Sequence, residues 1–107
     1  MSHETEARRI AAALHCAQAC HHCAASCLRE KDVAAMARCI ALDLDCAGIC
    51  ELAAAMMARG SEHAAAIRRL CADVCDACAK ECASHDAEHC RACAQACRAC
   101  ADACREP

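Results

Sequence analysis

The sequence contains no phenylalanine, tyrosine or tryptophan, and it has only two glycines and one proline in 107 residues. Because helix breakers are so few and alanine, the best helix former, is abundant, we predict an all-α protein. No stretch is long and apolar enough to predict a membrane-spanning helix. The length suits one hydrophobic core, so we predict a single domain over residues 1–107.

The charge balance argues against some partners. The net charge is −3, and nothing indicates binding to nucleic acid or to an anionic membrane. The first seven residues are polar, and no apolar segment of a signal peptide follows them. We therefore expect a cytoplasmic protein. We also expect the adjacent pair Arg8 and Arg9 to lie on a helix surface.

Turn and cap signals divide the chain into four predicted helices, at about residues 4–29, 33–59, 62–83 and 86–105. Asp32 and Ser61 are predicted N-caps, and Gly60 is predicted to end the second helix. Either Ser84 or Asp86 is expected to cap the fourth helix. Because turns this short make neighbouring helices antiparallel, we predict an up-down-up-down antiparallel four-helix bundle.

Cysteine is the residue that the sequence has in excess, with 16 copies. Within each predicted helix the cysteines recur mostly at steps of three and four, which places them on one helical face about 60° wide. The four ladders are Cys16, Cys20, Cys23 and Cys27; Cys39, Cys46 and Cys50; Cys71, Cys75, Cys78 and Cys82; and Cys90, Cys93, Cys97, Cys100 and Cys104. Four such faces turned inward would line the core with a column of thiols.

Cysteine at this density in a short chain usually indicates a secreted, disulfide-rich protein. Such proteins are rich in loops, whereas this chain is predicted to be helical throughout. Cysteines three or four positions apart on one helix also do not present their Cβ atoms in disulfide geometry. We therefore expect the cysteines to be reduced.

The chain also contains an internal repeat. The first cysteine ladder aligns with the third, 55 residues later, and the second aligns with the fourth, 54 residues later. In this alignment Met36 corresponds to Cys90, and Asp43 corresponds to Cys97. A thioether and a carboxylate can both bind metal, but Met36 is equally well explained as core filler. A buried carboxylate needs a partner, so for Asp43 we favour a role as a ligand or beside the ligands.

Thiolates are soft ligands that select Cu(I), Zn(II) or iron–sulfur clusters. Zinc and iron–sulfur sites take their cysteines mostly from loops. Here pairs such as Cys20 and Cys23 have the CxxC spacing but lie in the middle of predicted helices. Cu(I) is satisfied by two or three thiolates, and one thiolate can bridge two ions. A continuous helical ladder therefore suits a string of Cu(I) ions.

The ladders on four helices resemble those of the copper storage proteins, cysteine-lined four-helix bundles that hold many Cu(I) ions. The resemblance covers nearly the whole chain. In lacking an export signal, the sequence resembles the cytosolic branch of that family. It implies storage or buffering of copper without enzymatic turnover, all sixteen cysteines as ligands, and a homotetramer. The second helix departs from the pattern with only three cysteines. The alternative hypothesis is an iron–sulfur protein for electron transfer or metal sensing.

The two ends of the predicted column differ. The histidine end comprises Cys27, Met36, Cys82, His85, His89 and Cys90. We expect copper to enter and leave there, with Met36, His85 and His89 as additional ligands. The apolar end comprises Ala53, Met57, Ala64 and Ile67, which offer few groups able to relay the ion.

The first two predicted helices carry a second apolar stripe on the side away from their cysteines. It comprises Ile10, Leu14, Ala17, Leu28, Val33, Ala37, Ile40, Leu44 and Ala55. The other two helices have charged outer faces, which indicates that they face solvent. We therefore expect part of the stripe to pack between the first two helices and the rest to mediate self-association.

Overall fold

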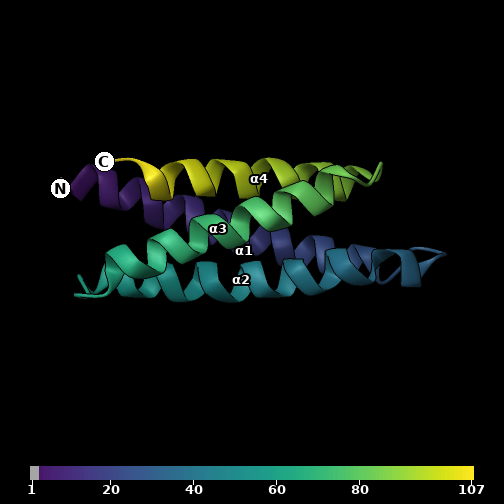
Figure 1. Ribbon diagram of the computed structural model, residues 1–107, viewed down its shortest axis with the longest axis horizontal. Helices are drawn as coiled ribbons and strands as arrows, with labels where there is room; N and C mark the ends of the chain where they lie inside the picture. Colours follow the sequence, from purple (N-terminus) through teal and green to yellow (C-terminus); the bar gives the residue numbers. More distant parts are fainter. Residues whose placement is uncertain (1–2) are drawn as a thin grey trace.

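The protein is a bundle of four antiparallel helices, 46 Å long and 17 Å across (Figure 1). A computed structural model describes residues 3–107; Met1 and Ser2, which begin the polar N-terminal segment, lie outside the described residues. The elements are α1 (His3–Cys27), the 3-10 turn η1 (Val33–Met36), α2 (Ala37–Ala58), α3 (Ala64–Ala83) and α4 (Glu88–Arg105). α1 and α3 each pack against both α2 and α4. The all-α four-helix bundle predicted from the sequence is confirmed.

The turn between α1 and α2 begins earlier than predicted, because α1 ends at Cys27 rather than near residue 29. Asp32 caps the next element as predicted, since its carboxylate accepts a hydrogen bond of 3.3 Å from the Ala35 N–H. That element is the tighter turn η1, and the regular helix α2 follows it. The turn brings Met36 into the core, where its side chain is 6% exposed.

The turn between α2 and α3 contains Gly60, whose φ of 64° is the left-handed conformation that glycine adopts without steric cost. Gly60 ends α2 as predicted. The predicted N-cap Ser61 is wrong, because His63 holds the N-cap position of α3 and Ser61 Oγ accepts a hydrogen bond from the His63 N–H within the turn. α3 consequently begins at Ala64, two residues later than predicted.

The predicted caps of the fourth helix are wrong. Ser84 Oγ donates a 2.6 Å hydrogen bond to the Glu81 carbonyl, so this side chain closes the end of α3. Ala87, with an extended backbone, occupies the N-cap position of α4 and makes no side-chain cap bond, so Asp86 does not serve there either. A helix C-terminus leaves carbonyl groups unsatisfied, and Ser84 lies nearer to those than to the start of α4.

The core consists mainly of cysteine and alanine. All sixteen cysteines are buried, as are alanines beside them such as Ala47 and Ala94. Met36 and Met57 are larger side chains at opposite ends, and Asp43 is fully buried between them. Small side chains at these positions let the sulfur atoms of all four helices meet.

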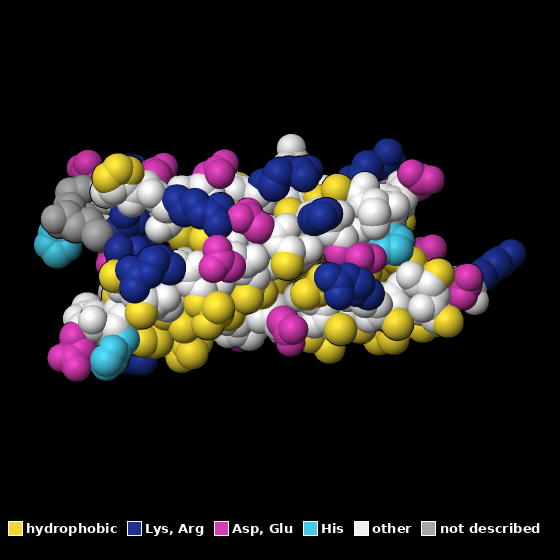
Figure 2. Space-filling view, in the orientation of Figure 1, with side chains coloured by type: hydrophobic (Ala, Val, Ile, Leu, Met, Phe, Trp, Pro, Cys, Tyr) yellow, Lys and Arg dark blue, Asp and Glu magenta, His cyan; other side chains and the backbone are white. Residues whose placement is uncertain are grey.

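Charged and apolar side chains cover different sides of the bundle. Figure 2 shows charged groups over α3 and α4, and hydrophobic side chains gathered along α2. The large exposed hydrophobic residues are Leu14, Leu28, Val33, Leu44, Leu52 and Leu70, and only Leu70 of these belongs to α3. As expected, part of the predicted stripe packs inside: Ala17 is buried and Ile40 lies against the core. No helix within residues 3–107 has the length and apolarity to cross a membrane.

The prediction of a surface position for Arg9 is wrong, since this residue is 1% exposed. Its Nε donates a 3.2 Å hydrogen bond to the Ala103 carbonyl, its Nη2 donates to the Glu106 carbonyl, and its Nη1 pairs with Glu6 at 3.4 Å. The guanidinium group therefore lies at the C-terminus of α4, where helix carbonyls carry partial negative charge. Arg8, with a side chain 60% exposed, lies on the surface as expected.

Candidate metal centre

The four cysteine ladders meet along the axis of the bundle. All sixteen cysteines are free thiols. Contacting Sγ atoms lie between 3.5 and 4.0 Å apart, far beyond the S–S bond length of about 2.05 Å. Many of these contacts join different helices: Cys16 of α1 lies 3.7 Å from both Cys46 of α2 and Cys97 of α4. The sulfur atoms thus form a connected chain.

The thiols form overlapping groups in which all ligand atoms lie within 4.8 Å of one another. These groups include Cys23, Cys27, Cys39 and Cys90; Cys20, Cys78, Cys93 and Cys97; Cys16, Cys20, Cys46 and Cys97; Cys16, Cys46, Cys50 and Cys75; and Cys50, Cys71, Cys75 and Cys100. Several cysteines belong to two groups. Four of these five groups share members with one another, and the fifth adjoins Cys82 through a contact of 3.5 Å from Cys39 Sγ. Such adjoining sites suit bridging thiolates.

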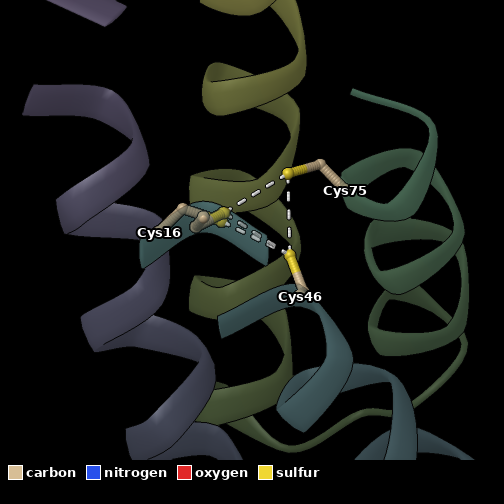
Figure 3. A group of neighbouring side chains, drawn as sticks. Cys16, Cys46 and Cys75 are labelled. Carbon is tan, nitrogen blue, oxygen red and sulfur yellow. Dashed lines mark hydrogen bonds between the residues drawn. The ribbon is translucent and has the colours of Figure 1, made fainter. Parts of the chain in front are cut away.

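One junction in the middle of the column shows how the helices contribute. Cys16, Cys46 and Cys75 come from α1, α2 and α3, and their sulfur atoms point toward one another (Figure 3). Cys46 Sγ lies 3.7 Å from Cys16 Sγ and 3.6 Å from Cys75 Sγ. Three soft donors converge here on a space that excludes water.

Asp43 lies among thiols of α2, α3 and α4. Its Oδ1 accepts hydrogen bonds from Cys78 at 3.3 Å, Cys82 at 3.4 Å and Cys93 at 3.3 Å. Its Oδ2 lies 3.8 Å from Cys39 Sγ. Burial, with the neighbouring Cys93 thiol next in importance, raises the pKa of Asp43 from 3.8 to about 9. The side chain is thus a neutral acid at pH 7 in the metal-free protein.

Burial also affects the thiols. It raises the pKa of Cys90 from 9.0 to about 11, and it raises the pKa of Cys39 further above the usual range of a thiol. An apolar surrounding disfavours the thiolate form. These thiols therefore keep their protons at neutral pH until a cation displaces them.

The histidine end brings together the predicted sulfur ligands. Cys27 Sγ lies 3.8 Å from Cys90 Sγ, and Cys39 Sγ lies 3.5 Å from Cys82 Sγ. All four thiols are fully buried, and Met36 belongs to the same core with a side chain that is 6% exposed.

The two histidines at this end are held differently. His85 Nε2 lies 2.8 Å from a Glu81 carboxylate oxygen of α3. His89 Nε2 is buried and has no hydrogen-bond partner among residues 3–107, since the nearest Glu30 oxygen is 3.9 Å away. His89 therefore keeps a nitrogen available to a ligand, whereas Glu81 orients His85.

The apolar end is closed by fewer residues than predicted. Ala53, Met57 and Ala64 are buried there, while Ile67 is only partly buried against the core. Arg9 completes the closure, and sequence reasoning missed it. The sequence did indicate this inward position, because the steps of four, three and four from Arg9 through Ala13 and Cys16 to Cys20 continue the spacing of the cysteine ladder.

The sequence matches the family model described as copper storage protein over residues 2–107. A relative in Bacillus subtilis (strain 168), described as the uncharacterized cysteine-rich protein YhjQ, is 47% identical over 84 residues, which cover 78% of each chain.

Solved structures agree with this match. The Cu(I)-bound copper storage protein BsCsp3 has a TM-score of 0.91 and 44% identity, with 94% of this chain and 95% of that chain covered. A cytosolic copper storage protein from Streptomyces lividans with five coppers has a TM-score of 0.93 and 46% identity, over 95% of this chain and 90% of that chain. Its form loaded with ten copper equivalents has the same TM-score and identity, over 95% of this chain and 82% of that chain.

Proposed function

Because this chain belongs to the copper storage protein family, we propose that it stores and buffers many Cu(I) ions inside its single bundle domain, without catalysing a reaction. The observation that carries this proposal is the connected chain of free, buried thiols contributed by all four helices. All sixteen cysteines act as ligands.

The geometry favours Cu(I) over the other soft cations. A zinc site needs four ligands arranged around one ion, and an iron–sulfur cluster needs cysteines that wrap it from loops. The thiols here are held on rigid helices in groups that share members. Cu(I) accepts two or three sulfur ligands and tolerates thiolates that bridge two ions. Thiols that belong to two groups therefore suit Cu(I) but do not suit separate zinc sites or iron–sulfur clusters.

Charge balance sets the expected capacity. Each Cu(I) that replaces one thiol proton leaves the core neutral, and a low-dielectric interior strongly disfavours any unbalanced charge. With every thiolate bridging two ions and every ion bound by two thiolates, the capacity is about one ion per cysteine, or about 16 per chain. One proton leaves for each ion that binds.

Asp43 and Met36 supplement the thiols. The Asp43 carboxyl already accepts hydrogen bonds from three thiols, so the loss of its proton would place a negative charge beside the first cations. Met36 replaces a cysteine of the repeat at the histidine end. We assign Asp43 as a ligand or a partner of ligands within the column, and Met36 with His89 as the groups that first receive copper. His85, which Glu81 holds, supports that end.

The environment and assembly follow from the same family. The Streptomyces lividans relative is described as cytosolic, and we infer the same location for this chain. We also propose a homo-oligomer, a tetramer by the resemblance, which would cover the exposed leucines of α1 and α2. Copper is the cargo that this protein would hold.

Anaerobic titration of the reduced protein with Cu(I), with copper counted after gel filtration, tests the proposal. We expect about 16 ions per chain and about one proton released per ion, read with a pH indicator. The loaded protein should be colourless, since Cu(I) thiolates lack the visible absorption of iron–sulfur clusters. Saturation at about one to four ions would contradict storage and indicate a discrete site.

A further inference from the structure

One thiol of the column differs from the rest in its access to solvent. Cys104 is 7% exposed, whereas each of the other fifteen cysteines is at most 1% exposed. It is the last cysteine of α4, at the apolar end, and its thiol interacts with those of Cys100 and Cys71. A thiol that is buried but not fully shielded from solvent, at the end of the column, gives a second point of contact with the stored metal.

Cys104 forms part of the wall of a surface cavity of about 450 Å³ between α3 and α4. The cavity is lined by Ala65, Arg68, Arg69, Asp73, Cys104, Arg105 and Glu106. Its volume lies within the range of about 300–1,000 Å³ that is usual for small-molecule sites.

The charges around the cavity leave two guanidinium groups uncompensated. Arg105 is held by Asp73 at 3.3 Å and by Asp76 at 2.7 Å. Glu106 pairs with Arg8 at 3.4 Å. Within residues 3–107, neither Arg68 nor Arg69 takes part in an ion pair. Each acidic side chain of the cavity therefore already has a cationic partner, although Asp73 shares Arg105 with Asp76, whereas Arg68 and Arg69 line the same cavity as Cys104 without an ion pair.

Guanidinium groups bind carboxylates through paired N–H donors, so Arg68 and Arg69 favour a ligand that carries carboxylates. If that ligand also carries a thiol, its sulfur can bind the same Cu(I) ion as Cys104. We propose that this cavity docks a small, carboxylate-bearing thiol of the glutathione type, which exchanges Cu(I) with the column at Cys104. This inference rests on the proposed storage function and adds to it a substrate class and a second exchange point.

The exchange is a ligand substitution. The sulfur of the docked thiol binds the Cu(I) ion held by Cys104 and a neighbouring thiolate, and the bonds between that ion and both cysteine sulfurs break. The neighbouring thiolate stays bound to the next ion of the column. The proton of the incoming thiol passes to Cys104 Sγ. Copper remains Cu(I) and no sulfur is oxidised, so the step needs no other reactant. Run in reverse, it loads the column from a copper–thiol complex.

The first test uses the metal-free protein, so that it does not depend on storage. The reduced protein is treated with a limiting amount of a dianionic aromatic disulfide, 5,5′-dithiobis(2-nitrobenzoate), or of the neutral 4,4′-dithiodipyridine. Peptide mapping identifies the cysteine that reacts first. We expect Cys104 with both reagents, and a rate advantage for the anionic one.

The matched variants separate charge from access. Arg68→Gln combined with Arg69→Gln should slow labelling by the anionic reagent about fivefold, as expected for the loss of two partly exposed charge contacts, and leave the neutral reagent unaffected. The control, Arg91→Gln with Arg98→Gln on α4, removes the same charge outside the cavity. If another cysteine reacts first, or if both double variants behave alike, the docking site is refuted.

The second test uses the copper-loaded protein. Removal of copper by glutathione should saturate with glutathione concentration, and the Arg68→Gln/Arg69→Gln variant should need about fivefold more to reach the same rate. Removal by uncharged 2-mercaptoethanol should be equal in both proteins. Equal rates of copper removal by glutathione from the two proteins would overturn the docking proposal. A protein that never holds many ions would instead refute storage, and the docking site would then be judged from the labelling experiment.

Discussion

Asp43 Oδ1 accepts a hydrogen bond of 3.3 Å from Cys78 Sγ within the thiol column. A carboxyl group at this depth is stable because three thiols donate to the same oxygen. The internal repeat has a cysteine, Cys97, at the corresponding position of α4. The column therefore contains one oxygen donor whose proton must leave before it can help to neutralise a cation.

Asp43 should make the stability of the metal-free protein depend on pH. Its pKa is raised from 3.8 to about 9, so above pH 4 the unfolded chain loses a proton that the folded chain keeps. The free energy of unfolding should therefore fall as pH rises between these values, by up to about 4 kcal/mol from pH 5 to pH 8. Urea unfolding of the reduced protein at both pH values measures this difference.

The matched variant for this prediction is Asp43→Asn, which keeps the shape and removes the ionisable group. All other ionisable groups of the chain are unchanged in the variant. The difference between the two pH dependences therefore isolates Asp43. Parallel curves for the two proteins would contradict the prediction.

Arg9 should stabilise the apolar end of the bundle. Arg9→Met keeps much of the volume but removes the guanidinium hydrogen bonds to the carbonyls of Ala103 and Glu106, which should lower the free energy of unfolding by about 1–3 kcal/mol. Arg8→Met on the exposed side should change it by no more than about 0.5 kcal/mol. Urea unfolding of the metal-free proteins measures both, and equal effects would show that Arg9 contributes no more than a surface residue.

Self-association should depend on the exposed leucines of α1 and α2. Leu14 and Leu44 are 51% and 52% exposed, so Leu14→Glu with Leu44→Glu places charges in the predicted interface without disturbing the core. We expect smaller particles in light scattering, with unchanged copper capacity. Leu70→Glu on α3, where the leucine is 53% exposed, is the matched control and should keep the wild-type mass. A monomeric wild type would remove the basis of this prediction.

The cysteine spacing was sufficient to predict the bundle and its thiol column, because a helical period fixes which side chains share a face. The repeat also identified Asp43 and Met36 as substitutes for cysteine, and both are buried in the core. Local patterns carry this information, since each ladder lies within one helix.

The features that the sequence did not predict depend on contacts between elements that the sequence pattern treats separately. Arg9 was predicted to lie on the surface because arginine usually does, whereas its carbonyl partners are 94 and 97 residues away. Ser84 was a plausible cap for α4, but the end of α3 offered a closer acceptor. The exposure of Cys104 equally depends on how α3 and α4 diverge at their ends, which no spacing of cysteines reveals.

The last prediction concerns the direction of loading. Copper that arrives as a complex must pass between soft ligands. The histidine end offers the Met36 thioether and the His89 Nε2, which makes no hydrogen bond within residues 3–107, together with Cys27 and Cys90. Met36→Ala with His89→Ala should therefore slow Cu(I) loading several-fold in stopped-flow absorption of the copper–thiolate bands. Total capacity should change little, because all sixteen thiols remain.

Met57→Ala is the control for this prediction. It removes a buried thioether of the same size from the apolar end, so any general loosening of the core should appear in this variant too. Its loading rate should equal that of the wild type, because copper that enters at the histidine end fills the column before it reaches Met57. If Met57→Ala slows loading and the double variant does not, copper enters at the apolar end, and the free nitrogen of His89 has another role.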